Sequence, residues 1–269
     1  MNKSITNFNT RLRTIKTREL LIGIIIAGIL SVILTIIFSP IVAEDEAFVL
    51  LFVLILILFF AYALSGTTGL SNNFQKLFED DTKKEIIYVF AINILFACLF
   101  MFLISALDIL MGLGDPTWIS MWDIDTVDAG SGVVLFDVIT AIILAPIVEE
   151  LVFRGVLFNR LKIRTGIIPS MLITSFLFAI GHDFGGITSA FLFGMCMCIL
   201  YLKTDNILVP MSVHFINNVV ATLMEITKID VFMAHIPWIV PSLILSIIGA
   251  YLLVKYIFKE TKKLKKEYG

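Results

Sequence analysis

The chain has 269 residues, of which 59% are hydrophobic and only 16% are charged, and its formal net charge is −2. Soluble proteins are about half apolar and about a quarter charged, so this composition excludes an ordinary soluble protein and favours an integral membrane protein. No pattern of nucleic-acid binding is present, and the three cysteines, all in apolar segments, form neither a disulfide framework nor a metal-ligand pattern.

Apolar segments follow one another along the whole chain at the length that a membrane span requires. A bilayer core of about 30 Å is crossed by about 20 helical residues. The fifth segment is the shortest and ends at a Gly-His pair. Eight spans are predicted: Leu20–Ala43, Ala47–Ser65, Ile86–Leu113, Val133–Leu161, Gly166–Gly181, Phe184–Leu202, Ile207–Ile226 and Pro237–Phe258.

The basic residues predict which side of the membrane each loop faces. If the N-terminus is cytoplasmic, eight crossings place 18 of the 20 Lys and Arg residues on the cytoplasmic side, as the positive-inside rule requires. Lys228 falls on the other side, and Arg154 falls within a span. We therefore expect an all-α polytopic membrane protein, a bundle of about eight transmembrane helices with both termini in the cytoplasm. The basic tail KETKKLKKEYG is interpreted as an anchor near anionic lipid.

The fourth span contains three charged residues, Glu149, Glu150 and Arg154. Each ionisable group within a span costs about 2.5 to 3.5 kcal/mol on insertion scales, so each requires a partner or a function. Glu150 and Arg154 are four residues apart and about 40° apart on one helix face, which predicts an ion pair. Glu149 is rotated by about 100° from Glu150 and has no basic residue one turn away. This unpaired carboxylate is the stronger functional candidate.

Two later spans place histidines where they can meet Glu149. Phe178 and His182 in the fifth span, and His214 and Asn218 in the seventh, are each four residues apart and share a helix face. Counted from the cytoplasmic ends at 1.5 Å per residue, these groups reach depths that converge near the middle of the bilayer. We therefore predict a site formed by a carboxylate, two imidazoles and an amide.

Such a site suits amide hydrolysis by an activated water. A carboxylate beside a histidine can take a proton from water, and a second histidine with an amide can donate hydrogen bonds to an oxyanion. The same residues allow a second chemistry, in which Glu149, His182 and His214 hold a catalytic zinc ion. No Gly-x-Ser-x-Gly, Cys-His pair or His-Glu-x-x-His motif supports other hydrolase classes.

The order of these motifs resembles a known family of membrane proteases. EELVFR at 149–154, FAIGH at 178–182 and HFINN at 214–218 look like the motifs of the intramembrane proteases that include the CAAX prenyl endopeptidases, bacteriocin-processing proteins and abortive-infection proteins. The resemblance covers about residues 133–220. It implies an integrated fold in which residues 133–220 form the protease core, residues 1–132 hold a tail and three helices, and residues 221–269 hold the last helix and a basic tail.

The resemblance also implies roles for individual residues. Glu149 and His182 would activate the water, His214 and Asn218 would stabilise the oxyanion, and Glu150, Arg154 and Phe178 would support the site. Family members are often described as metal-dependent metalloendopeptidases, whereas the roles above need no metal. We favour a metal-free mechanism, with zinc on Glu149, His182 and His214 as the alternative cofactor site.

The expected partners are the lipid bilayer and a membrane-associated or membrane-inserted peptide or protein substrate, with no nucleic acid, in a multi-pass protein of the bacterial cell membrane. The resemblance does not fix whether that substrate is prenylated. The alternative is a non-catalytic or weakly catalytic protein of the same fold that acts in bacteriocin self-immunity or beside a membrane signalling protein. An ion-coupled transporter is disfavoured, because the sequence shows no repeated halves.

Overall fold

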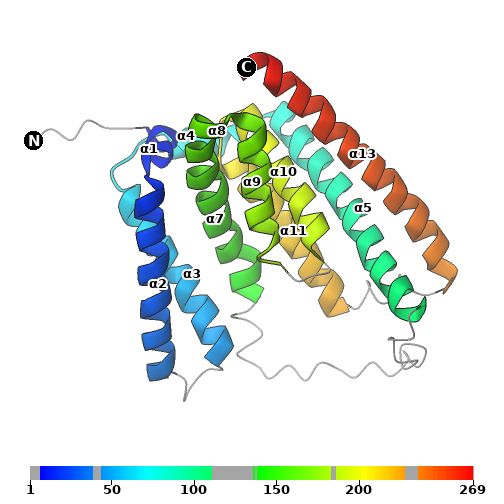
Figure 1. Cartoon of the computed structure of the whole chain (residues 1–269), viewed down its shortest axis with the longest axis horizontal. Helices are drawn as coiled ribbons and strands as arrows, with labels where there is room; N and C mark the ends of the chain where they lie inside the picture. The colour runs from blue at the N-terminus through cyan, green and yellow to red at the C-terminus, as the bar shows by residue number, and fades with distance from the viewer. Residues whose placement is uncertain are drawn as a thin grey trace, which may run out of the picture.

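The computed structural model describes residues 7–38, 44–110, 136, 138–182, 186–227 and 236–268. These residues are almost entirely helical and contain no β-strand, which confirms the all-α prediction for the described part. Eight long helical segments correspond to the eight predicted spans (Figure 1). They are α2 (Thr17–Phe38), α3 (Glu44–Ala63), α5 (Asp80–Leu110), a composite helix from η2 (Thr140–Leu144) through α7 (Ala145–Glu150) and η3 (Leu151–Phe158) to α8 (Asn159–Thr165), then α9 (Ile167–Ala179), α10 (Ile187–Thr204), α11 (Leu208–Thr227) and α13 (Ile236–Tyr268).

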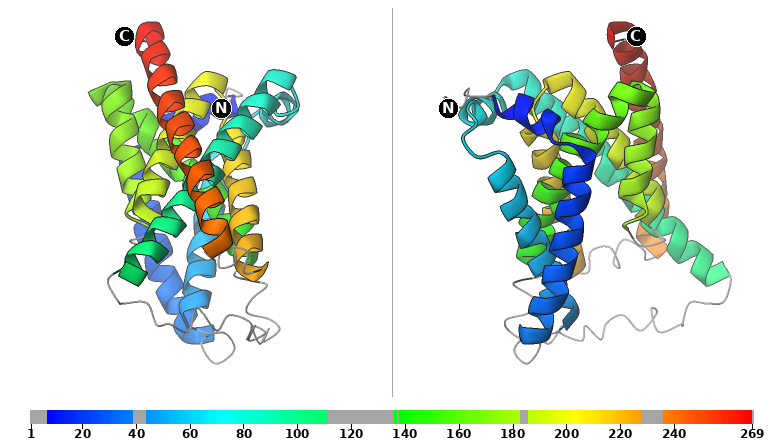
Figure 2. Two further views of the ribbon diagram at one scale, coloured as in Figure 1. Left: turned by 90° about the vertical axis from the view of Figure 1, so that its right-hand side faces the viewer. Right: turned by 60° about the vertical axis from the view of Figure 1, so that its left-hand side comes forward.

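The helices form one bundle with a central buried helix. Figures 1 and 2 show α2 beside α3 at one edge and α5 beside α13 at the opposite edge, with α9 against α10 between them. Every residue of α10 from Phe193 to Tyr201 is buried. Since α10 is packed on several sides, it forms the scaffold on which the composite helix and α11 lie.

The outside of the bundle is apolar. On α2, large side chains such as Ile22, Ile25 and Ile29 are about half exposed, a surface that suits lipid and not water. Among the described residues, the helices Thr17–Ile37 and Ile187–Thr204 are long and apolar enough to cross a membrane on their own, and Ala47–Ala63, Ile167–Ala179 and Leu208–Met224 form shorter apolar helices. The number of crossings and the side of the termini stay predictions.

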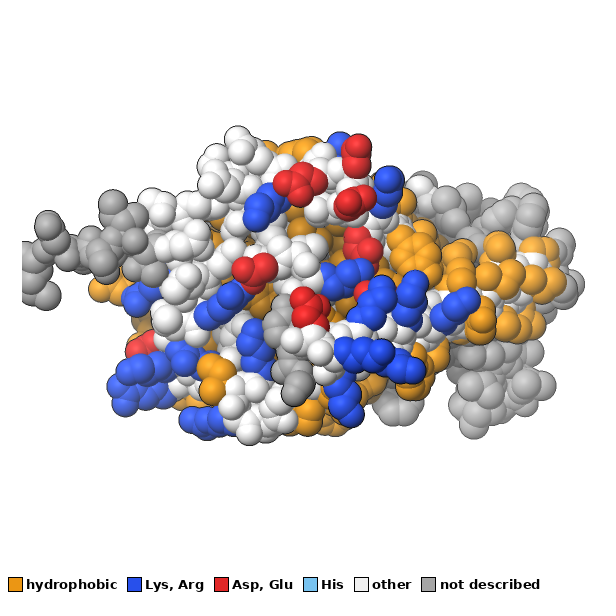
Figure 3. Space-filling view, turned by 90° about the horizontal axis from the view of Figure 1, so that it is seen from above, with side chains coloured by type: hydrophobic (Ala, Val, Ile, Leu, Met, Phe, Trp, Pro, Cys, Tyr) orange, Lys and Arg blue, Asp and Glu red, His pale blue; other side chains and the backbone are white. Residues whose placement is uncertain are grey.

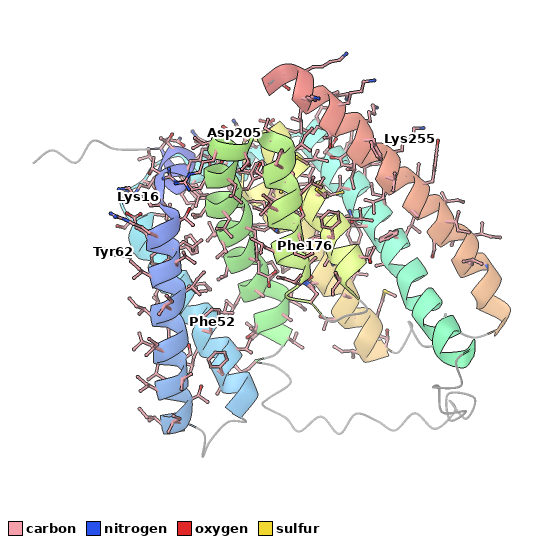
Figure 4. All side chains as sticks on the ribbon, viewed as in Figure 1. Lys16, Phe52, Tyr62, Phe176, Asp205 and Lys255 are labelled. Atoms are coloured by element: carbon pink, nitrogen blue, oxygen red, sulfur yellow. The ribbon has the colours of Figure 1, made fainter. Side chains whose placement is uncertain are left out.

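One end of the bundle carries the charged residues. Figure 3 shows Lys, Arg, Asp and Glu side chains gathered on this end, and Figure 4 places the labelled Lys16 and Asp205 there. Two short helices that the sequence analysis did not predict lie at this end, α1 (Phe8–Thr14) and α4 (Leu70–Lys76). Hydropathy overlooked them because only single apolar residues, such as Phe8 and Leu12 of α1, are buried.

Two helices extend beyond the predicted spans. The helix α5 begins at Asp80, whereas the span was predicted from Ile86, and α13 continues to Tyr268, past the predicted end at Phe258. Hydropathy marks only the apolar part of a helix, while Lys and Glu, which are good helix formers, continue the helix outside it. The fifth segment, α9, has only 13 residues, or about 20 Å of helix.

The helices α5 and α13 approach closely at Gly249. A Cβ atom added at Gly249 would lie 2.6 Å from Cβ of Leu95 and 2.9 Å from its carbonyl carbon, so the backbone of α5 would have to move. By contrast, a Cβ at Gly28 on α2 meets nothing within 4 Å.

We predict that Gly249→Ala destabilises the α5–α13 pair by about 1 to 3 kcal/mol, the usual cost of overpacking. The Tm in detergent should fall, while Gly28→Ala as the matched control should leave it unchanged or raise it slightly. Equal Tm values for the two variants would contradict the close packing described here.

The sidedness prediction has its own measurement. A fluorescent protein fused after residue 269 should fluoresce, because it stays in the cytoplasm, and alkaline phosphatase inserted between residues 114 and 132, outside the described residues, should be active, because it is exported. Active phosphatase at the C-terminus would overturn the predicted orientation.

Candidate active site

The two predicted carboxylates lie at a change in helix geometry. The α-helical turn of α7 ends at Glu150, and the π-helical segment η3 begins at Leu151. Such π-helical turns are rare and occur frequently at functional sites. Glu150 is completely buried, whereas the side chain of Glu149 is 34% exposed. The junction therefore presents one enclosed carboxylate and one accessible carboxylate side by side.

Arg154 neutralises the enclosed carboxylate. Its Nη1 donates to Oε1 of Glu150 at 2.9 Å, and both side chains are fully buried, so the predicted ion pair is confirmed. Nη2 of Arg154 donates to the carbonyl of Gly194 on α10 at 3.2 Å. Its guanidinium carbon also lies 4.6 Å from the ring centroid of Phe178, a cation–π distance.

His214 on α11 lies between the two carboxylates. Its Nδ1 is 3.1 Å from Oε1 of Glu150, the same oxygen that accepts from Arg154. Its Nε2 is 3.6 Å from Oε2 of Glu149. Since a carboxylate accepts hydrogen bonds, we assign the hydrogen of this contact to Nδ1. The Nε2 edge of the ring thus faces the exposed carboxylate.

Aromatic rings fix the plane of this imidazole. Phe178 and Phe193 both meet the His214 ring edge-on, with centroid distances of 5.7 and 5.1 Å. Phe178 is only 2% exposed. Its ring contacts both the guanidinium of Arg154 and the imidazole of His214, so it supports both side chains. The supporting role expected of Phe178 stays a prediction.

His182 and Asn218 lie around this centre without bonding to His214. His182 is exposed, with Nδ1 3.0 Å from the carbonyl oxygen of Phe178 and its ring centroid 4.6 Å from that of Phe178. The Nδ2 atom of Asn218 donates to the carbonyl of Ala141 in η2 at 2.8 Å. This bond uses one of the two amide hydrogens of Asn218.

Three contributors to the site were not singled out from the sequence. Phe193 packs on His214, the Gly194 carbonyl accepts from Arg154, and Asn159 donates to the carbonyls of Arg154 and Gly155 at 3.0 and 2.8 Å. Gly194 could have been noticed in the sequence, because it is a small residue within a helix of bulky side chains. A Cβ there would lie 3.0 Å from Cβ of Ser175, so α9 and α10 approach closely at this point.

The zinc alternative does not fit these positions. Among the described residues, no group of three or more His, Cys, Asp or Glu side chains is close enough to hold a metal ion. Glu149, His182 and His214 thus do not form a ligand set here, and the mechanism below has no step through a metal.

Comparisons with known proteins agree with the motifs. The model of the family described as type II CAAX prenyl endopeptidase Rce1-like matches residues 131–220. The putative membrane peptidase YdiL of Bacillus subtilis (strain 168) is 30% identical over 93 residues, which cover 34% of this chain and 38% of that protein. The chain thus matches less than half the length of this relative. No solved structure matches the chain.

The matched segment contains Glu149, Glu150, Arg154, His182 and His214. It also contains the residues that supply the contacts of the site, from the composite helix to the part of α11 up to residue 220. Residues 131–220 are therefore similar to the type II CAAX prenyl endopeptidase Rce1-like family and to a membrane peptidase, in agreement with the resemblance of the three sequence motifs.

Proposed function

We propose that the protein is a membrane-embedded endopeptidase that hydrolyses a peptide bond with a water activated by Glu149. One observation carries the proposal: Nε2 of His214 lies 3.6 Å from Oε2 of Glu149 while the Glu150–Arg154 pair holds the other side of the ring. This separation exceeds a hydrogen bond, and a single water to the side of the two atoms can lie at about 2.8 Å from each. The water would lie beside the exposed carboxylate, where a substrate has access.

Hydrolysis then proceeds with Glu149 as the general base. The carboxylate takes a proton from the water as its oxygen bonds to the substrate carbonyl carbon, and the carbonyl oxygen becomes an oxyanion. The intermediate collapses with cleavage of the C–N bond, and the proton on Glu149 passes to the leaving amine. His182, an exposed imidazole just after α9, assists Glu149 in this role.

His214 and Asn218 stabilise the oxyanion. An imidazole protonated at both nitrogens donates from Nε2 towards the substrate, while Nδ1 remains bonded to Glu150. The second amide hydrogen of Asn218, on the same face of α11, points to the same oxyanion.

The substrate class follows from the position of the site. Glu149 and His214 lie within helices whose outer surfaces are apolar, which supports a membrane-associated or membrane-inserted peptide or protein as the substrate. The matched family is described by its prenyl endopeptidase activity, and we therefore propose that a C-terminal peptide with a prenylated cysteine is one chemical form of the substrate.

Substitution at the site tests the proposal directly. A fluorogenic peptide with a farnesylated cysteine and three further C-terminal residues is presented to the full chain in lipid nanodiscs. Glu149→Gln should reduce cleavage by about 10²- to 10⁴-fold, the range for loss of a general base, and His214→Ala by about 10²- to 10³-fold, the range for loss of an oxyanion donor.

The matched control is Glu267→Gln, an exposed carboxylate near the end of α13, which should cleave as the wild type does. Since the reporter represents one substrate class, membrane and secreted peptides from cells with wild-type and Glu149→Gln protein are compared by mass spectrometry as well. Identical peptide sets, or full reporter cleavage by both site variants, would favour the non-catalytic alternative.

A metal measurement tests the proposed mechanism separately. Protein purified in detergent should contain well below one zinc per chain, with the same amount in Glu149→Gln, and a chelator should not abolish cleavage. One zinc per chain that disappears in Glu149→Gln would replace the metal-free mechanism with a zinc mechanism.

A further inference from the structure

We propose that Leu12, Tyr201 and Asn159 are positioning residues that hold the π-helical segment η3, and with it Arg154, in the geometry of the site. This inference rests on the proposed function, and it adds the N-terminal helix α1 to the catalytic machinery. The segment that matches the family begins at residue 131, so α1 lies outside it. Even so, α1 contacts η3 at the charged end of the bundle.

The first link is an apolar contact between α1 and the backbone next to Arg154. Leu12 is completely buried. Its side chain lies so close to Gly155 that a Cβ atom added there would be 2.9 Å from Cδ1 of Leu12. Gly155 follows Arg154 directly in the chain. A displacement of α1 therefore removes the packing on the residue that adjoins the cation of the site.

The second link is a chain of hydrogen bonds that runs through a buried tyrosine. Nε of Arg13 donates to the hydroxyl of Tyr201 at 3.3 Å, and Nδ2 of Asn159 donates to the same hydroxyl at 2.9 Å. Arg13 is held from the other side by an ion pair with Asp205. Tyr201 and Asn159 are almost fully buried, so these bonds are shielded from competing water.

Asn159 transfers this connection to the π-helical backbone. Its backbone N–H bonds to the carbonyl of Val156, where the helical pattern changes, and its side-chain amide donates to the carbonyls of Arg154 and Gly155 at 3.0 and 2.8 Å. A third link ties α8 to the end of α1, since Nε of Arg160 donates to the carbonyl of Ile15 at 2.7 Å.

These contacts meet a specific need of the site. A π-helical turn is less favourable than an α-helical one and rarely extends beyond a single turn, so η3 requires contacts from outside the helix. If η3 relaxed towards regular α-helical pitch, the spacing of four residues would keep Arg154 beside Glu150, but Arg154 would shift against α9 and α10. Its bond to the carbonyl of Gly194 and its contact with the ring of Phe178 would then be lost, and with them the position of the ion pair beside His214.

Hydrogen–deuterium exchange on the full chain in nanodiscs tests the inference without any substrate. Leu12→Ala removes the packing on Gly155, and Tyr201→Phe removes only the hydroxyl. Both should accelerate exchange in residues 151–158 by about fivefold or more through local opening, and leave α3 and α13 unchanged. The matched control is Arg11→Gln on the same helix, because Nε of Arg11 donates to the carbonyl of Ala63 on α3 and not to η3.

Cleavage of the farnesylated reporter gives the second readout. Leu12→Ala and Tyr201→Phe should lower kcat by about 10- to 100-fold, as misplacement of a catalytic group does, with little change in KM. Unchanged exchange in residues 151–158, or an equal rise in Arg11→Gln or throughout the bundle, would overturn the positioning role. Because exchange needs no activity, its outcome is independent of whether Glu149→Gln abolishes cleavage.

Discussion

The structure depends on one buried carboxylate and the cation that balances it. Glu150 and Arg154 have no exposed surface, and a charge left alone in such a place is strongly destabilising, by about 3 to 5 kcal/mol when one partner of a buried pair is removed. The pair constrains its neighbours because each member has further bonds. Arg154 binds the carbonyl of Gly194 on α10, and Glu150 binds Nδ1 of His214 on α11. Three helices are thus joined at one ion pair.

This arrangement separates the roles of two adjacent glutamates. Glu150 uses one carboxylate oxygen to hold both Arg154 and His214, so it serves as an orienting group. Glu149, one residue earlier, remains 34% exposed and lies 3.6 Å from the other nitrogen of the same imidazole. Among the described residues, Glu149 contacts His214 without a direct hydrogen bond, and we propose that this leaves its carboxylate available for proton transfer. The chemistry proposed for Glu149 is therefore a consequence of the structural task that Glu150 performs.

Much of this site could be predicted from the sequence, and the limits of that prediction have physical causes. The Glu150–Arg154 pair follows from a spacing of four residues within one helix, and Glu149 has no partner on its own helix for the same reason. The sequence also placed His214 and Asn218 on one helix face, but it did not predict that Nδ1 of His214 lies beside Glu150 or that Asn218 donates to the carbonyl of Ala141. These contacts depend on how α11 packs against the composite helix, which helical periodicity does not specify.

The π-helical segment and its supports were beyond sequence reasoning for a related reason. An apolar run with good helix formers predicts a regular helix, and the wider turn of η3 becomes visible only with its external contacts, such as Asn159 at its end and Leu12 against Gly155. The polar residues of α1 indicated only a cytoplasmic tail. In the structure that segment packs on the helix that carries the site, because single buried side chains are sufficient to dock a short helix on a rigid bundle.

The central claim is that Glu150 fixes the orientation and protonation of His214. Nitrogen NMR of histidine-labelled protein measures this directly, and the chain has only three histidines, so the His214 signal is assigned by its loss in His214→Ala. The account predicts a proton on Nδ1 with the shift of a bond to a carboxylate, and a clear change of that shift in Glu150→Gln. An Nδ1 without a proton, or a His214 signal that does not change in Glu150→Gln, would contradict this claim.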